Sequence, residues 1–132
     1  MYKKTLTLVS IFLFIFSSLV FSEENNISVS KMVFCQEVEE LQPIKIDSTF
    51  ADTVDKVYCF TKIKGAQDTI EITHVWSRKG EEMARVPLSV KSSSWRTWSS
   101  KQMLESWTGQ WRVDVISPEG DVLKSKSFEI KK

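Results

Sequence analysis

The sequence is poor in the side chains on which most enzymes and metal sites depend. Its 132 residues include one histidine, two cysteines, three prolines and four glycines. His74 is therefore the only side chain whose ordinary pKa suits proton transfer near neutral pH. A zinc or copper site needs several ligands at suitable spacing, and neither CxxC nor HxxxH occurs. This composition favours a protein that is not an enzyme and that holds no metal and no cofactor.

The catalytic alternative, a hydrolase, rests on His74 alone. This residue shares a predicted strand face with Trp76 and two isoleucines, which is typical of a neutral histidine near the core. We expect it to bond a backbone carbonyl or a hydroxyl such as that of Thr97 or Ser99. No GxSxG nucleophile elbow occurs, and the acidic residues are scattered through predicted turns and polar faces.

The chain also lacks an excess of charge of either sign. It has 18 basic and 17 acidic residues, and removal of residues 1–22 would take only Lys3 and Lys4 from that count. Nucleic-acid-binding proteins usually carry a basic excess on one face. We therefore expect no nucleic-acid partner.

The N-terminus has the layout of a secretory signal peptide. Two lysines precede an apolar run from Leu6 to Phe21, and the chain turns polar at Glu23. The run is short for spanning ~30 Å of hydrocarbon. We predict cleavage after Ser22, with membrane contact only through this segment if it stays uncleaved, and export to the periplasm or cell envelope.

The predicted organisation is a signal peptide over residues 1–22, a flexible leader over 23–30 and one domain over 31–130. Cys35 and Cys59 both lie in that domain, and an exported protein can keep a disulfide. We expect them to be bonded, which would contribute ~3 kcal/mol by loop closure. The alternative is a pair of buried thiols.

Seven segments have the residue types and alternation of β-strands. They are separated by turn residues, and this spacing is typical of a β-sandwich or barrel. We predict an all-β fold, a single immunoglobulin-like sandwich of two sheets. The seven segments are Lys31–Val38, Val57–Lys64, Thr69–Ser77, Glu82–Val90, Trp95–Ser99, Gly109–Ile116 and Val122–Ile130.

Two connections between these strands carry predictions of their own. Glu39–Asp55 contains acidic residues and a proline and is predicted to be a loop, with Phe50 turned inward. Ser99–Trp107 is predicted to hold at most one short helix, because Ser99 and Gln102 fit a capping box.

Four of the five tryptophans lie close together in the second half of the chain. Period-two alternation separates them. Trp111 alternates with aliphatic residues and is predicted to lie in the core with Trp76. Trp95 and Trp98 must point to opposite faces of their strand, so at least one is expected to be partly exposed.

Six short motifs stand in a characteristic order along the chain: Phe34-Cys35, Val57-Tyr58-Cys59-Phe60, Thr73-His74-Val75-Trp76, Trp95-Arg96-Thr97-Trp98-Ser99, Gly109-Gln110-Trp111-Arg112-Val113 and Phe128-Glu129-Ile130. In this order they resemble an uncharacterised bacterial domain family, domain of unknown function 2914. The resemblance runs from about Lys31 to Ile130. It implies a small exported domain or a module of a larger envelope protein, and it implies no assigned activity.

These observations predict an exported, non-catalytic binding or scaffolding domain of the bacterial cell envelope. The expected partner is an envelope protein, and a glycan bound by exposed tryptophan is the alternative. Arginine beside tryptophan can either clasp strands together or present a mixed surface to a ligand. The predicted binding residues are Trp95, Arg96, Trp98 and Trp107.

Overall fold

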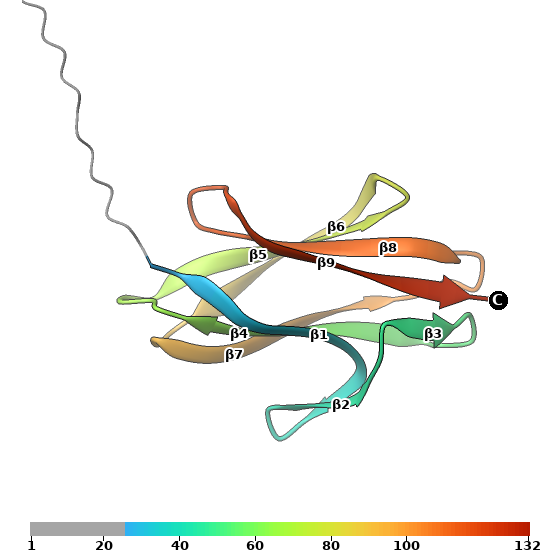
Figure 1. Cartoon of the computed structure of the whole chain (residues 1–132), viewed down its shortest axis with the longest axis horizontal. Coiled ribbons are helices and arrows are strands. Elements are labelled where there is room, and N and C mark those ends of the chain that lie inside the picture. Colours follow the sequence, from blue (N-terminus) through green and yellow to red (C-terminus); the bar gives the residue numbers. More distant parts are fainter. Residues whose placement is uncertain (1–25) are drawn as a thin grey trace, which may run out of the picture.

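The computed structural model describes residues 26–132, and these residues form nine β-strands and no helix. The predicted signal peptide over residues 1–22 lies outside the described residues. Along the described chain, shown in Figure 1, the strands are β1 (Ser28–Glu39), β2 (Gln42–Ile46), β3 (Thr49–Ala51), β4 (Lys56–Lys64), β5 (Ile70–Arg78), β6 (Glu81–Val90), β7 (Ser94–Gln102), β8 (Gly109–Ile116) and β9 (Val122–Lys131).

The strands form two sheets that face each other (Figure 1). One sheet has the order β2-β1-β4-β7, and the other has the order β3-β9-β8-β5-β6. Only β3 and β9 run parallel; the other paired strands are antiparallel. The predicted all-β sandwich of two sheets is confirmed.

The strand order has the immunoglobulin arrangement. That fold places strands A, B and E in one sheet opposite strands C, F and G in the other. Here β1, β4 and β7 lie side by side in one sheet, opposite β5, β8 and β9. Strand β6 pairs with β5, as the added strand of a variable-type domain pairs with strand C.

The core between the sheets is aromatic at its centre. Phe128 on β9 stacks on Trp111 with ring centroids 5.9 Å apart, contacts Trp76 edge-on, and lies 4.5 Å from Phe34 of the opposite sheet. Trp76 and Trp111 are almost fully buried. Their predicted core positions are therefore confirmed, and the ring pairs join both sheets.

All seven predicted strands are present, and two more lie within the segment predicted to be a loop, Glu39–Asp55. Strand β2 contains Pro43, which a sheet tolerates only at an edge or a bulge, and β2 is an edge strand. Strand β3 has three residues and pairs with β9, while Phe50 packs into the core as predicted.

Ser99–Trp107 contains no helix, in agreement with the prediction of at most one short helix there. Strand β7 continues to Gln102 and pairs with β4 at every position. The Ser99 hydroxyl bonds two side chains of the opposite sheet instead of capping a helix. At the other end of the domain, β1 begins at Ser28, ahead of the predicted boundary at Lys31.

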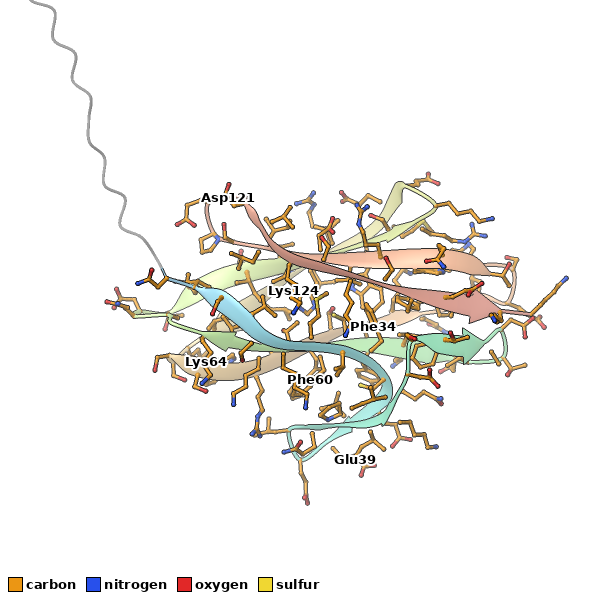
Figure 2. The ribbon with its side chains drawn as sticks, in the orientation of Figure 1. Phe34, Glu39, Phe60, Lys64, Asp121 and Lys124 are labelled. Carbon is orange, nitrogen blue, oxygen red and sulfur yellow. The ribbon has the colours of Figure 1, made fainter. Side chains whose placement is uncertain are left out.

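The predicted Cys35–Cys59 disulfide is wrong, because both cysteines are free and buried. They lie on neighbouring strands, where Cys35 is opposite Tyr58 and Cys59 is opposite Phe34. Side chains alternate along a strand, so one thiol points into the core and the other to the outer face of the sheet. Figure 2 shows the same division, with Phe34 on the side of β1 that faces the other sheet and Phe60 on the opposite side.

We predict that the native protein contains two thiols that react slowly. Burial raises the pKa of both Cys35 and Cys59, so little thiolate forms near neutral pH. Titration with a thiol reagent without reductant should detect almost no reaction in the folded protein and two thiols after denaturation. Absence of thiols after denaturation would show that the two strands adopt another register.

Candidate functional site

A buried polar network joins the two sheets around His74. His74 and Trp76 lie on β5, Thr61 lies on β4, and Thr97 and Ser99 lie on β7. The Thr61 hydroxyl is 3.3 Å from His74 Nε2, and the Ser99 hydroxyl is 2.6 Å from His74 Nδ1. The expected bond between His74 and a hydroxyl is confirmed for Ser99. Strands β4 and β7 of one sheet and β5 of the other therefore meet at one imidazole.

The network determines which imidazole nitrogen carries the proton. Thr61 donates its hydroxyl to the carbonyl of Thr97 at 2.9 Å, so its oxygen accepts from His74 Nε2. Trp76 Nε1 donates to the Ser99 oxygen at 3.0 Å, and Ser99 donates its proton to His74 Nδ1. Each group thus has a partner only while the imidazole is neutral.

The electrostatics agree with this assignment. Burial lowers the pKa of His74 to about 4, since no acidic side chain compensates for the lost hydration of the charged form. His74 is 0% exposed. In this structure the His74 side chain contacts no solvent.

The predicted binding residues on β7 lie on both faces of the sheet. Trp95 is opposite Ile63, a fully buried core residue, and packs at the margin of the core. Trp98 is opposite Phe60 on the outer face, and the two rings stack with centroids 5.9 Å apart and planes 11° apart. The predicted separation of Trp95 from Trp98 is thus present. Trp98 is half-buried.

Arg96 shares the outer face with Trp98 and contacts the hairpin formed by β1 and β2. Its guanidinium donates to the carbonyl of Leu41 at 3.4 Å. The hairpin lies below the four-stranded sheet in Figure 1, on the side away from the core. Between hairpin and sheet is a cleft of 320 Å³ lined by Leu41, Lys62, Ser92, Ser94, Trp95 and Arg96.

The tip of this hairpin has an unusual backbone. Glu40 and Leu41 are its two loop residues, and both have positive φ angles, 51° and 63°. Such type I′ turns strongly favour asparagine and glycine, because other side chains are strained there. Leu41 is nevertheless 51% exposed, so burial of its side chain does not compensate for the strain.

Trp107 lies apart from the other predicted binding residues. It follows β7 at the end opposite Ser94 and Arg96, where its ring packs against Trp111 at 5.9 Å. Its carbonyl accepts a hydrogen bond from Trp111 Nε1, and the Lys101 ammonium lies 4.8 Å from its ring centre. Trp107 therefore closes one end of the core. The four predicted residues do not form one surface.

Sequence reasoning missed several members of the outer face. Alternation along Val57–Lys64 places Phe60, Lys62 and Lys64 on the same face as Trp98, and that signal was available in the sequence. The hairpin tip had no such signal, because Glu40 and Leu41 are not turn-forming residues. We refer to Leu41, Phe60, Lys62, Arg96 and Trp98 together as the hairpin surface.

The strands that carry this surface are basic. Strands β4 and β7 together contain five basic residues and no acidic residue: Lys56, Lys62, Lys64, Arg96 and Lys101. The ion pairs found within residues 26–132 join Arg85 to Glu82 and Arg112 to Asp114, both in the other sheet. The cations of the hairpin surface are therefore not neutralised by ion pairs within the described part of the chain.

Three further features of the described residues bear on function. No group of three or more His, Cys, Asp or Glu side chains in residues 26–132 is placed to hold a metal ion. No helix in that range is long and apolar enough to cross a membrane. A second cleft, of 420 Å³, lies where Ala51–Lys56 meets Gln36, Glu37 and Tyr58.

A model of the family described as "Protein of unknown function (DUF2914)" matches residues 70–130. The resemblance noted in the sequence is confirmed over these residues. The matched range begins at β5 and ends in β9, so the motifs on β1 and β4 lie outside it. None of the curated proteins matches the chain.

Several solved structures show weak similarity. Selenomethionine-labelled β-glucosidase from Kluyveromyces marxianus is 14% identical over 80% of this chain, with a TM-score of 0.46. The glucose complex of that enzyme is 12% identical over 81%, with a TM-score of 0.47. This chain spans only 14% of the β-glucosidase chain. An endonuclease/exonuclease/phosphatase from Beutenbergia cavernae DSM 12333 is 16% identical over 61% of this chain and 25% of its own, with a TM-score of 0.35. Similarities this weak carry no functional argument.

We predict that the protein loses stability as the pH falls from about 6.5 to 4. In this window the unfolded state binds a proton at His74 and the folded state does not, so the free energy of unfolding is greatest above pH 6.5, decreases as the pH falls through the window, and is not lowered further by His74 below pH 4. The loss should approach ~3 kcal/mol by linkage. Urea unfolding at several pH values measures it. His74→Gln should fold more weakly but lack this pH dependence; an equal slope in the variant would contradict the assignment.

Proposed function

We propose that this chain is an exported, non-catalytic binding domain of the bacterial cell envelope and that its partner is a protein. The observation that carries the proposal is the hairpin surface. It combines a half-buried tryptophan stacked on a phenylalanine, an arginine that forms no ion pair within residues 26–132, and an exposed leucine at a strained turn. The N-terminal signal-like segment and the family resemblance support export and the envelope.

The residue types of the hairpin surface suit a protein interface. Tryptophan and arginine are the side chains that most often dominate binding energy at such interfaces. Trp98 is held by Phe60 and Arg96 by the Leu41 carbonyl, so both side chains lose little rotamer freedom on binding. A surface that is already ordered in the free protein needs fewer contacts to reach a given affinity.

The hairpin tip supports the same interpretation. A residue other than glycine at positive φ costs about 1–3 kcal/mol, and such strain is concentrated at binding and catalytic sites. Leu41 and Ile46 are each 51% exposed and stand at the two ends of β2. Placing apolar side chains on a protruding hairpin is costly for a free domain and useful for one that docks on a partner.

A glycan is the second candidate. The indole of Trp98 lies parallel to Phe60, so its other face is directed away from that ring, with Arg96 and Ser100 beside it on the same strand face. A flat aromatic ring flanked by hydrogen-bonding side chains suits a sugar ring. Trp107, whose ring packs at the end of the core, contributes to neither candidate surface.

We predict that Arg96→Ala and Trp98→Ala abolish capture of an envelope protein that the wild-type chain binds. The matched control is Arg112→Ala, which removes an exposed arginine from the opposite sheet. Each variant is checked for folding by circular dichroism. The captured protein is identified by mass spectrometry and purified. Its Kd is then measured for the wild-type chain and for each of the three variants.

The outcomes separate the alternatives. Loss of binding in Arg96→Ala and Trp98→Ala, with binding retained in Arg112→Ala, is the expected result. Equal binding by all variants would contradict the assignment of the surface. Binding of envelope oligosaccharides instead, lost only in Trp98→Ala, would favour the glycan candidate.

A further inference from the structure

We propose that the free edge of β7 binds an extended acidic segment of the partner protein as an additional strand of the four-stranded sheet. The inference rests on the proposed protein-binding function and specifies how the partner is held. Extended peptides commonly bind in this way, with backbone hydrogen bonds supplying affinity and alternate side chains supplying specificity.

Three of the four sheet edges are protected against pairing. The edge strands are β2 and β7 in one sheet and β3 and β6 in the other. Strand β2 contains Pro43, β3 has only three residues, and β6 contains Pro87 and a bulge opposite Trp76 and Ser77. Short strands, proline and bulges are the usual means of blocking edge pairing.

Strand β7 has none of these features. It has nine residues without proline, and its register with β4 runs from Lys64↔Ser94 to Lys56↔Gln102 without a bulge. Its C-terminal part carries one safeguard, the cation of Lys101, which is opposite the core residue Val57 and so lies on the inner face. The Ser94 carbonyl already accepts a hydrogen bond from the Ser92 hydroxyl at 3.0 Å, so the unprotected stretch is Trp95–Ser100.

The direction of the backbone groups along this stretch follows from the hydrogen bonds at both its ends. Gly65 N donates to Ser93 O at 2.9 Å, and Met103 N donates to Asp55 O at 2.9 Å. Ser93 directly precedes β7 and Met103 directly follows it, so in both bonds an odd-numbered residue of this stretch bonds to the chain of β4. In an antiparallel pair, residues alternately direct their N–H and C=O groups toward the neighbouring strand and away from it.

Even-numbered residues therefore direct their backbone groups away from β4, toward the free edge. These are Ser94, Arg96, Trp98, Ser100 and Gln102. The same residues place their side chains on the outer face of the sheet, since Trp98 is opposite Phe60 there. A strand added at this edge would bond to the main chain of Arg96, Trp98 and Ser100 and lie beside the hairpin surface.

The charge of the surface identifies the chemistry of the added strand. Arg96, Lys62 and Lys64 lie on the outer face, and neither β4 nor β7 has an acidic residue. A segment with acidic side chains at alternate positions would meet these cations with one face. A second copy of this chain would instead bring the same cations of two sheets together, so electrostatics disfavour pairing of β7 with itself.

The test is selection of random nine-residue peptides, the length of β7, on the purified protein by display. The expected peptides have β-forming residues alternating with Asp or Glu. Their Kd is then measured for the wild-type protein, Ser100→Pro and Ser100→Ala. Proline removes the N–H directed to the free edge and leaves the bonds to β4 in place, whereas alanine removes only the hydroxyl.

We expect Ser100→Pro to weaken binding about tenfold or more, and Ser100→Ala to leave it unchanged. N-methylation of alternate residues in the selected peptide should cause a similar loss in the wild-type protein, which keeps the test valid if Ser100→Pro fails to fold. Arg96→Glu should weaken the binding of acidic peptides and leave the binding of their uncharged analogues unchanged.

Two results would overturn the inference. The first is that the selected peptides lack alternating acids, or that they bind Ser100→Pro as tightly as the wild-type protein and bind equally well when N-methylated. This result would show that the partner docks by side chains alone. The proposed protein-binding function would then stand without strand addition. The second is self-association of the wild-type protein that Ser100→Pro abolishes, which would assign the edge to a second copy.

A different measurement shows whether the proposed function itself fails. Equal capture of the envelope protein by wild type, Arg96→Ala and Trp98→Ala would contradict that function.

Discussion

The pairing of β4 with β7 is the constraint on which both the core and the surface of this domain depend. Nine residue pairs run without a bulge, so every second side chain must face the core and the others must face outward. Ser99 and Thr97 thereby reach the His74 network, while Trp98 and Arg96 are held on the outer face. A slip of one residue would exchange the two sets and destroy both.

The buried network and the exposed surface are thus two consequences of one register. Burying the network removes several polar groups from water, which costs free energy. Hydrogen bonds offset this cost only when every donor meets its acceptor. Within residues 26–132 no buried side-chain nitrogen or oxygen lacks a partner. A polar core of this kind tolerates few alternative arrangements of β4, β5 and β7. It therefore holds Trp98 and Arg96 in one position, as a preformed binding surface requires.

Much of this architecture was predictable from the sequence, for physical reasons. Alternation identified seven strands and placed Trp76 and Trp111 in the core, because burial of one strand face leaves a period of two. The two short strands within Glu39–Asp55 escaped prediction, because β2 carries Pro43 and β3 depends on a partner far along the chain. The disulfide prediction failed because the spacing of cysteines gives no information about strand register. The register places Cys35 and Cys59 on opposite faces of the sheet.

The site was predicted only in part. Trp98 and Arg96 were among the predicted binding residues and lie on the outer face, but Trp107 packs beside Trp111 at the end of the core. Leu41 belongs to a turn whose residues give no turn signal. The direction of backbone groups on β7 depends on pairing and cannot be read from residue types.

Amide hydrogen exchange along β7, followed by NMR, tests the central claim most directly. The amides of Thr97 and Ser99, which bond to β4, should exchange slowly, and those of Arg96, Trp98 and Ser100 should exchange much faster. Equal protection along the strand, or protection of the even-numbered amides in the free monomeric protein, would contradict the account of an open edge beside a preformed surface.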